Sequence, residues 1–288
     1  MTTLSESPGL LLNPEAVKNR TVPSTGIRVV VSGKGGVGKT TLTGFLAHLF
    51  ARVGYRVLAV DGDPQQNLAA TLGIPPGQAD AIVPISRHTA YIREKTGADP
   101  GLSSGGFITL NPDVTDVVDR FSLPVAPNLR LLVMGGVVQA GAGCLCAEYT
   151  LLAAVLRNLQ LLPDEVILLD TPAGMEHFGR AVADGFTTAL IVADPTVSAL
   201  SVANEGALLA RQLGIRQVIL AVNRVRGDED MKKVAGQYAA GPFSGQVCLP
   251  YDPEILRREP AVDRLISCES AYMRQLRTLA GIIGDPGG

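Results

Sequence analysis

The residues with the clearest chemical potential form a glycine-rich run near the start of the chain. In order they are Gly33, Lys34, Gly35, Gly36, Val37, Gly38, Lys39, Thr40 and Thr41. The first eight have the spacing G-x-x-x-x-G-K-[ST]. Glycines let successive backbone N–H groups turn toward one anion, the lysine after the last glycine reaches the β- and γ-phosphates, and the next hydroxyl binds Mg²⁺. The run therefore predicts a phosphate-binding loop, or P-loop.

Such a loop needs a strand before it and a helix after it. Residues 27–31 are a β-branched run that predicts a buried strand, and residues 41–50 carry leucines and phenylalanines on one helical face. Gly54 ends that helix, and residues 56–60 predict a second strand. The order strand, loop, helix, strand is a βαβ unit, which implies a parallel sheet with a right-handed crossover.

The rest of the chain continues this alternation. Further strands are expected at residues 129–134, 166–169, 189–192, 218–222 and 246–249, and helices at 147–160, 197–213 and 267–283. Residues 73–128, rich in Pro, Gly, Ser and Asp, are expected to add a helix and loops over one sheet edge. The prediction is one α/β P-loop domain with a doubly wound, mostly parallel sheet over residues 27–288, preceded by a flexible extension at 1–26.

Composition narrows the class of protein. The 288 residues carry 25 Lys+Arg against 27 Asp+Glu, a net charge of −2, which argues against a nucleic-acid partner. No apolar run approaches the roughly 20 residues of a membrane-spanning helix, so no stable membrane insertion is expected. No secretory signal is visible, and four cysteines are too few for a disulfide scaffold. We expect a reduced, cytoplasmic protein.

Carboxylates follow two of the predicted strands. Asp61 and Asp63 come after residues 56–60, and Asp170 comes after 166–169. Strand ends of open α/β sheets are where ligands bind. Carboxylates beside a P-loop suit water-mediated contact with Mg²⁺ and alignment of an attacking water. Asp170 therefore looks like the Walker B aspartate, and Thr171 to Gly174 look like a switch that senses the γ-phosphate.

Lys34 makes the glycine-rich run more specific. The octapeptide 34–41 resembles the deviant P-loop of the ParA/MinD/nitrogenase-iron-protein class. That resemblance implies a homodimer in which Lys34 reaches the partner's nucleotide and acts in catalysis with Lys39. It also implies that Asp63 positions the attacking water and that Asp61 and Thr40 serve the Mg²⁺ ion together with Asp170.

A base-binding site is implied by the same class. Asn223 resembles its adenine-contacting asparagine, and Pro250 and Asp252 resemble its second base-contacting segment. An amide both donates to and accepts from the adenine edge. The sequence after Asn223 lacks the N-K-x-D pattern expected for guanine, so the expected nucleotides are ATP and ADP, with Mg²⁺, and the expected activity is ATP hydrolysis.

Cys144 and Cys146 form a Cys-x-Cys turn. Two such thiols can chelate one soft metal, although two buried apolar thiols are an equally good explanation of the pair alone. Tetrahedral thiolate sites usually need four ligands, and a dimer would supply each cysteine twice. Thiolate sets suit Zn²⁺, Cu(I) and nickel alike, and the expected occupant of a dimer-interface site is Ni²⁺ or Zn²⁺, nickel being implied by the family resemblance described next. Cys248, on a predicted buried strand, and Cys268, on a predicted helix, are expected to be core or surface thiols without a metal-binding role.

The Cys-x-Cys turn, together with the A-G-x-E-H-x-G-R run at residues 173–180, resembles the CooC-type nickel-insertion ATPases. That resemblance implies maturation of carbon monoxide dehydrogenase as the client enzyme. Thr171 and Pro172 depart from the expected pattern, and His177 is expected to be a hydrogen-bonding switch residue rather than a ligand. The alternatives are a MinD/ParA-type spatial-organiser ATPase without a metal-delivery role and, ranked last, an iron–sulfur electron donor.

Overall fold

The computed structural model describes residues 26–97, 109, 112–135, 151, 153–156, 162–174, 185–238 and 241–284. The predicted extension at 1–26 lies almost wholly outside these ranges. So do Cys144, Cys146 and His177, and the sequence predictions for them stay predictions.

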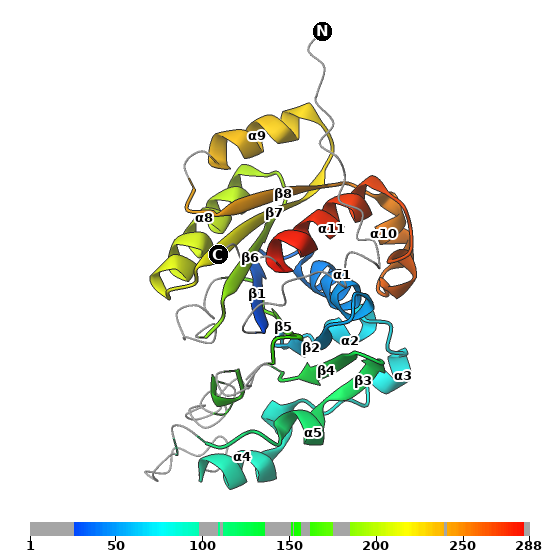
Figure 1. Cartoon of the computed structure of the whole chain (residues 1–288), viewed down its shortest axis with the longest axis vertical. Helices are drawn as coiled ribbons and strands as arrows, with labels where there is room; N and C mark the ends of the chain where they lie inside the picture. The colour runs from blue at the N-terminus through cyan, green and yellow to red at the C-terminus, as the bar shows by residue number, and fades with distance from the viewer. Residues whose placement is uncertain are drawn as a thin grey trace.

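The core of the molecule is an eight-stranded sheet in the order β3-β4-β2-β5-β1-β6-β7-β8 (Figure 1). All neighbouring pairs are parallel except β3 and β4, which are antiparallel. This confirms the predicted doubly wound, mostly parallel α/β fold. The strands are β1 (Ile27–Gly33), β2 (Arg56–Asp61), β3 (Leu123–Ala126), β4 (Leu129–Val133), β5 (Glu165–Asp170), β6 (Thr188–Ala193), β7 (Gln217–Val225) and β8 (Gly245–Pro250).

Helices cover both faces of the sheet (Figure 1). The β1-to-β2 and β6-to-β7 crossovers run in opposite directions along the sheet, so their helices, α1 and α8, lie on opposite faces. The last helix, α11, packs against β8 and α1. The described helices are α1 (Lys39–Arg52), α2 (Leu68–Thr71), α3 (Pro76–Ala79), α4 (Thr89–Thr96), α5 (Val117–Phe121), α8 (Val197–Gln212), α9 (Asp228–Tyr238), α10 (Pro253–Arg258) and α11 (Ala271–Gly284), with 3-10 turns η2 (Ile85–Arg87) and η3 (Asp263–Leu265).

The centre of the sheet positions the candidate site. Every residue of β1 except Arg28 is buried, as its β-branched sequence predicts. Val31 of β1 and Asp61 of β2 both lie in register with Asp170 of β5. The carboxyl ends of three neighbouring strands therefore meet beside the loop between β1 and α1.

Some elements differ from the sequence predictions. Residues 73–128 hold several short helices and the edge strand β3, where one helix and loops were expected. Helices α9 and α10 were not predicted. The last helix begins at Ala271, so Cys268 lies before it as an exposed thiol, and its predicted helical position is wrong. Within the described part of 147–160, residues 151 and 153–156 are helical as predicted.

Candidate functional site

The backbone of the glycine-rich loop has a conformation and close neighbours that leave no room for a Cβ atom at several of its glycines. Gly36 and Gly38 have φ angles of 78° and 96°. A Cβ on Gly33 would lie 2.1 Å from the carbonyl oxygen of Val192, and one on Gly38 would lie 2.5 Å from Nδ2 of Asn223. The glycines are therefore required by left-handed backbone and by close neighbours, which is the property expected of an anion cradle.

The amino terminus of α1 opens directly onto this loop. The helix begins at Lys39, its cap residue Gly38 makes no side-chain hydrogen bond, and no acidic residue stands in the first turn. The first N–H groups of a helix lack intrahelical partners, and the helix dipole places partial positive charge there. The site can therefore bind a phosphate group without any rearrangement of the helix.

The two lysines of the loop lie in different surroundings. Lys39 is 7% exposed, and its ammonium donates a hydrogen bond to the Lys34 carbonyl oxygen at 3.1 Å. Burial lowers the pKa of Lys39, against the opposing attraction of Asp170 and Asp63. Lys34 is exposed, and its ammonium donates to Oγ of Ser198, on the first turn of α8, at 2.6 Å. Lys39 thus faces the loop interior, while Lys34 lies along its outer side.

Asp170 lies against the hydroxyl that the motif assigns to Mg²⁺. Oδ2 of Asp170 accepts a hydrogen bond from Thr40 at 2.6 Å, and Oδ1 accepts one from Thr43 at 3.5 Å. The carboxyl is buried, and desolvation raises its pKa to about 6 despite the attraction of Lys39. Paired hydroxyl and carboxylate oxygens are the hard ligands that Mg²⁺ prefers.

Asp61 and Asp63 lie in different environments, one buried and the other at a cavity. Asp61 is fully buried, and its two oxygens accept backbone N–H bonds from Asp63 and Leu68, each at 3.0 Å. Desolvation, and then repulsion from Asp170, raises its pKa to about 7. Asp63 lines the cavity beside the glycine-rich loop. Asp61 therefore orders the loop that carries Asp63, and Asp63 has access to a ligand.

The segment after β5 contacts the glycine-rich loop. The Thr171 hydroxyl donates to the Val31 carbonyl at 2.7 Å, and the Gly174 N–H donates to the Gly33 carbonyl at 3.3 Å. Pro172 and Ala173 line the same cavity as Asp63. The segment is therefore bonded to β1 and to the start of the glycine-rich loop, a position that a γ-phosphate-sensing switch requires.

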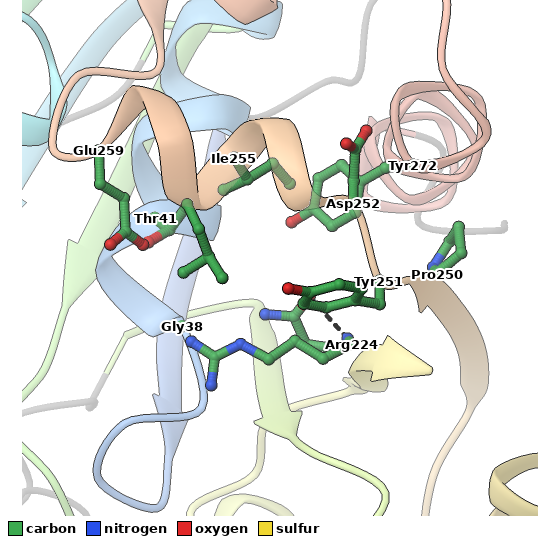
Figure 2. Close-up of a pocket in the computed structure, with 11 residues that line it drawn as sticks. Gly38, Thr41, Arg224, Pro250, Tyr251, Asp252, Ile255, Glu259 and Tyr272 are labelled. Carbon is green, nitrogen blue, oxygen red and sulfur yellow. Dashed lines mark hydrogen bonds between the residues drawn. The ribbon is translucent and has the colours of Figure 1, made fainter. Parts of the chain in front are cut away.

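A second pocket lies on the other side of Gly38 and Thr41 (Figure 2). It brings together Asn223 from β7, Pro250 and Asp252 around the end of β8, and Tyr272 from α11. The Asn223 amide donates to the Val37 carbonyl at 2.9 Å, which ties β7 to the glycine-rich loop. The structure therefore gathers the three residues predicted to contact a base, and adds a tyrosine that the sequence analysis did not select.

The two cavities share four lining residues: Gly38, Thr41, Arg224 and Glu259. A ligand that fills both must pass this junction, as the sugar and first phosphate of a nucleotide would. Arg224, at a φ of 60°, donates to the Gly36 carbonyl at 2.9 Å. Arg224 and Glu259 were not predicted from the sequence as site residues. A basic residue directly after Asn223 was a usable signal for the first, whereas no motif marked the second.

The residues present fit a magnesium nucleotide. The glycine cradle, the open helix terminus and Lys39 suit phosphates, and the pair Thr40 and Asp170 suits Mg²⁺. When bound, Mg²⁺ supplies charge neutralisation between the β- and γ-phosphate oxygens. Among the described residues, no group of three or more His, Cys, Asp or Glu is placed to hold a metal ion. The predicted thiolate site rests on Cys144 and Cys146, outside those ranges.

The fold and site define a P-loop nucleotide-binding protein, and comparison with known families makes the class specific. Residues 28–261 match the family described as "CobQ/CobB/MinD/ParA nucleotide binding domain". The chain belongs to this family of ParA/MinD-class P-loop ATPases.

Individual relatives of known sequence support the same family assignment. The carbon monoxide dehydrogenase accessory protein CooC of Rhodospirillum rubrum is 36% identical over 82% of this chain and 88% of its own length. An ATP-binding protein of Methanocaldococcus jannaschii is 38% identical over 81% of this chain and 88% of its own. The resemblance to CooC-type ATPases drawn from the sequence is confirmed.

Solved structures support the fold. The cell division ATPase MinD of Pyrococcus furiosus superposes with a TM-score of 0.64 at 23% identity, covering 91% of this chain and all of that one. MinD of Pyrococcus horikoshii, solved with Mg-ADP, has a TM-score of 0.59 at 21% identity, covering 90% of this chain and 98% of that one. No helix in the described ranges has the length and apolarity needed to span a bilayer.

Proposed function

We propose that this chain is a Mg²⁺-dependent ATPase that forms an ATP-linked homodimer and inserts nickel into a client metalloenzyme. The observation that carries the metal role is the coincidence of a Cys-x-Cys turn with 36% identity to a protein named as a carbon monoxide dehydrogenase accessory protein. The client is then carbon monoxide dehydrogenase, and the work is carried out in the cytoplasm.

The nucleotide site supplies the energy of the cycle. Lys39 and the backbone N–H groups of the glycine-rich loop hold the phosphates, while Thr40 and Asp170 hold Mg²⁺, with Asp61 behind them. Asp63, which lines the phosphate cavity, aligns the attacking water. The contacts supporting this assignment are the 2.6 Å bond between Thr40 and Asp170 and the burial of Lys39 at the loop.

Base recognition follows from the second pocket. Asn223, Pro250 and Asp252 line this pocket, and we assign them to the adenine base. The bond from the Asn223 amide to the Val37 carbonyl holds this pocket against the glycine-rich loop. A nucleotide can fill both sites, whereas a free polyphosphate makes no contact in the base pocket, which favours ATP and ADP.

Lys34 links two copies of the chain. It is exposed, and its contact with Ser198 is an intrasubunit bond at the rim of the loop. An exposed hydrogen bond of this kind contributes little net stability, about 1 kcal/mol. Lys34 can therefore leave Ser198 and neutralise charge on the partner's nucleotide, as an arginine finger does.

The metal site completes the proposal. One chain offers two thiolates, Cys144 and Cys146, whereas tetrahedral thiolate sites usually have four ligands. ATP favours the closed dimer, in which both pairs meet around Ni²⁺ or Zn²⁺, and hydrolysis favours release to the client. The requirement is that ATP binds the closed dimer more tightly than the separate chains.

The test combines light scattering after gel filtration with elemental analysis, in ADP and in a non-hydrolysable ATP analogue. The wild type should form a dimer with the analogue and retain about one metal ion per two chains. The double variant Cys144→Ser/Cys146→Ser should dimerise but lose the metal. The matched control Cys248→Ser/Cys268→Ser should keep both properties, because those thiols are single and separate.

Each half of the proposal can fail separately. Metal retained at the wild-type level by the Cys144→Ser/Cys146→Ser variant would refute the thiolate site. Lys34→Ala should bind ATP but stay monomeric. A Lys34→Ala protein that dimerises as the wild type does would refute the bridging role of that lysine.

A spatial-organiser role is the second candidate. A putative septum site-determining protein MinD of Mesostigma viride is 31% identical over 69% of this chain, although the chain spans only 60% of that relative. ATP-dependent pelleting with liposomes or DNA, without bound metal in the dimer, would favour this role over metal delivery.

A further inference from the structure

Tyr272 reaches the base pocket from a distant part of the chain. It lies on α11 and is 2% exposed, yet its hydroxyl points into the pocket between Ile255 and the ring of Tyr251 (Figure 2). Among the described residues, no hydrogen-bond partner of this hydroxyl is found. Burial raises the pKa of Tyr272, so the phenol remains a neutral donor and acceptor.

Two of the neighbouring polar side chains already have partners within the protein. The Asn223 side chain donates to the Val37 carbonyl and accepts the Arg224 N–H at 3.0 Å. Asp252 accepts the Glu254 N–H at 3.1 Å and caps α10. Among the described residues, the hydroxyls of Thr41, Tyr251 and Tyr272 line the pocket without a hydrogen bond to the protein, and Tyr272 is the one of the three that α11 carries. The hydroxyl is open to the pocket that Tyr272 lines, so a ligand atom that enters the pocket can become its hydrogen-bond partner.

The phenol is also held in place. Its ring packs against Phe45 of α1 with ring centroids 5.5 Å apart. Helix α1 begins in the glycine-rich loop, so Tyr272 has a fixed position relative to the phosphate site. A rigid hydroxyl at a set distance from the phosphates is suited to recognise one edge of a base attached to them.

We propose that the Tyr272 hydroxyl hydrogen-bonds the polar edge of the adenine base, which makes helix α11 part of the nucleotide site. The hydroxyl donates to a ring nitrogen or accepts from the exocyclic amine. This inference rests on the proposed function, since it assumes that the second pocket holds the base.

The test is Tyr272→Phe, which removes one oxygen atom and keeps the ring against Phe45. Tyr55→Phe is the matched control, since Tyr55 is also buried and packs on Phe50 of the same helix, with centroids 5.6 Å apart, but lines neither cavity. Calorimetry with Mg²⁺ measures the Kd of ADP and of inorganic tripolyphosphate for each protein. Tyr272→Phe should raise the ADP Kd about five- to tenfold and leave the tripolyphosphate Kd unchanged. Tyr55→Phe should change neither.

The outcomes distinguish a failure of the Tyr272 contact from a failure of the base pocket itself. Should Tyr272→Phe bind ADP as tightly as the wild type, or lose both ligands by the same factor, the base contact is overturned and the hydroxyl is only structural. Should the wild type itself bind ADP no better than tripolyphosphate, the base pocket fails, and with it the proposed ATP specificity.

Discussion

Replacing Asp61 with asparagine should stabilise the nucleotide-free protein at high pH and destabilise it at low pH. Asp61 is fully buried next to Asp170, and burial raises its pKa from an ordinary 3.8 to about 7. Between these values the native state holds a proton that the unfolded chain has released. The free energy of unfolding therefore falls as the pH rises, and the loss is complete above about pH 7.

The magnitude follows from the two pKa values. About three pKa units correspond to roughly 4 kcal/mol of stability that Asp61 alone removes from the nucleotide-free protein between pH 4 and pH 8, and Asp170, whose pKa is also raised, titrates in the wild type and in the variant alike. Asp61→Asn does not titrate, but its amide nitrogen replaces one of the two oxygens that accept the Asp63 and Leu68 N–H groups. One buried N–H then lacks an acceptor, which destabilises the variant by about 1–3 kcal/mol at every pH.

The two effects combine into a crossing of the stability curves. At pH 8 the variant should be more stable than the wild type by about 2 kcal/mol, and at pH 4.5 less stable by about 1 kcal/mol. The assay is urea unfolding from pH 4.5 to pH 8 with EDTA and without nucleotide, so that no ligand stabilises the native state. Parallel curves, with the variant weaker throughout, would refute the buried-carboxylate argument.

Three further variants probe the glycine-rich loop. Gly38→Ala places a Cβ 2.5 Å from Nδ2 of Asn223 at a φ of 96°, so it should weaken ADP binding more than about tenfold by calorimetry; near-normal affinity would contradict the strain argument. Ser198→Ala frees Lys34 from its 2.6 Å bond and should tighten ATP-analogue-dependent dimerisation about two- to fivefold in analytical ultracentrifugation, whereas weaker dimerisation would mean that Ser198 assists the lysine. Arg224→Gln removes the cation at the junction of the two cavities and should weaken ADP binding about tenfold without changing adenosine binding; equal losses for both would assign Arg224 to the base instead.

Local sequence patterns predicted the elements whose signals are local. The glycine-rich loop is specified within residues 33–41, because left-handed backbone, an open helix terminus and a lysine are properties of neighbouring residues. The buried strands β1, β5 and β6 were predicted because parallel strands covered on both faces are continuous apolar runs. The apolar face of α11 was predicted by helical spacing, and its Leu276 and Leu279 are buried.

Elements without an apolar pattern were missed. Helix α9 begins with three acidic residues and carries ion pairs on its surface, including Lys232 with Glu229 at 2.7 Å. Its stability comes from the helix dipole and from charge pairs rather than from a continuous buried stripe. Strand β3 is a short edge strand that contains Pro124, a residue typical of edges and weak as a strand signal.

The sequence by itself determined the class of chemistry, because a phosphate cradle needs residues that are adjacent in the chain. Tertiary structure alone decided which distant side chains complete the site. Tyr272 reaches the pocket because α11 packs on β8 and α1, and Ser198 meets Lys34 because β6 pairs with β1. Contacts across more than a hundred residues depend on strand order, and periodicity reveals that a strand exists but not which strand lies next to it.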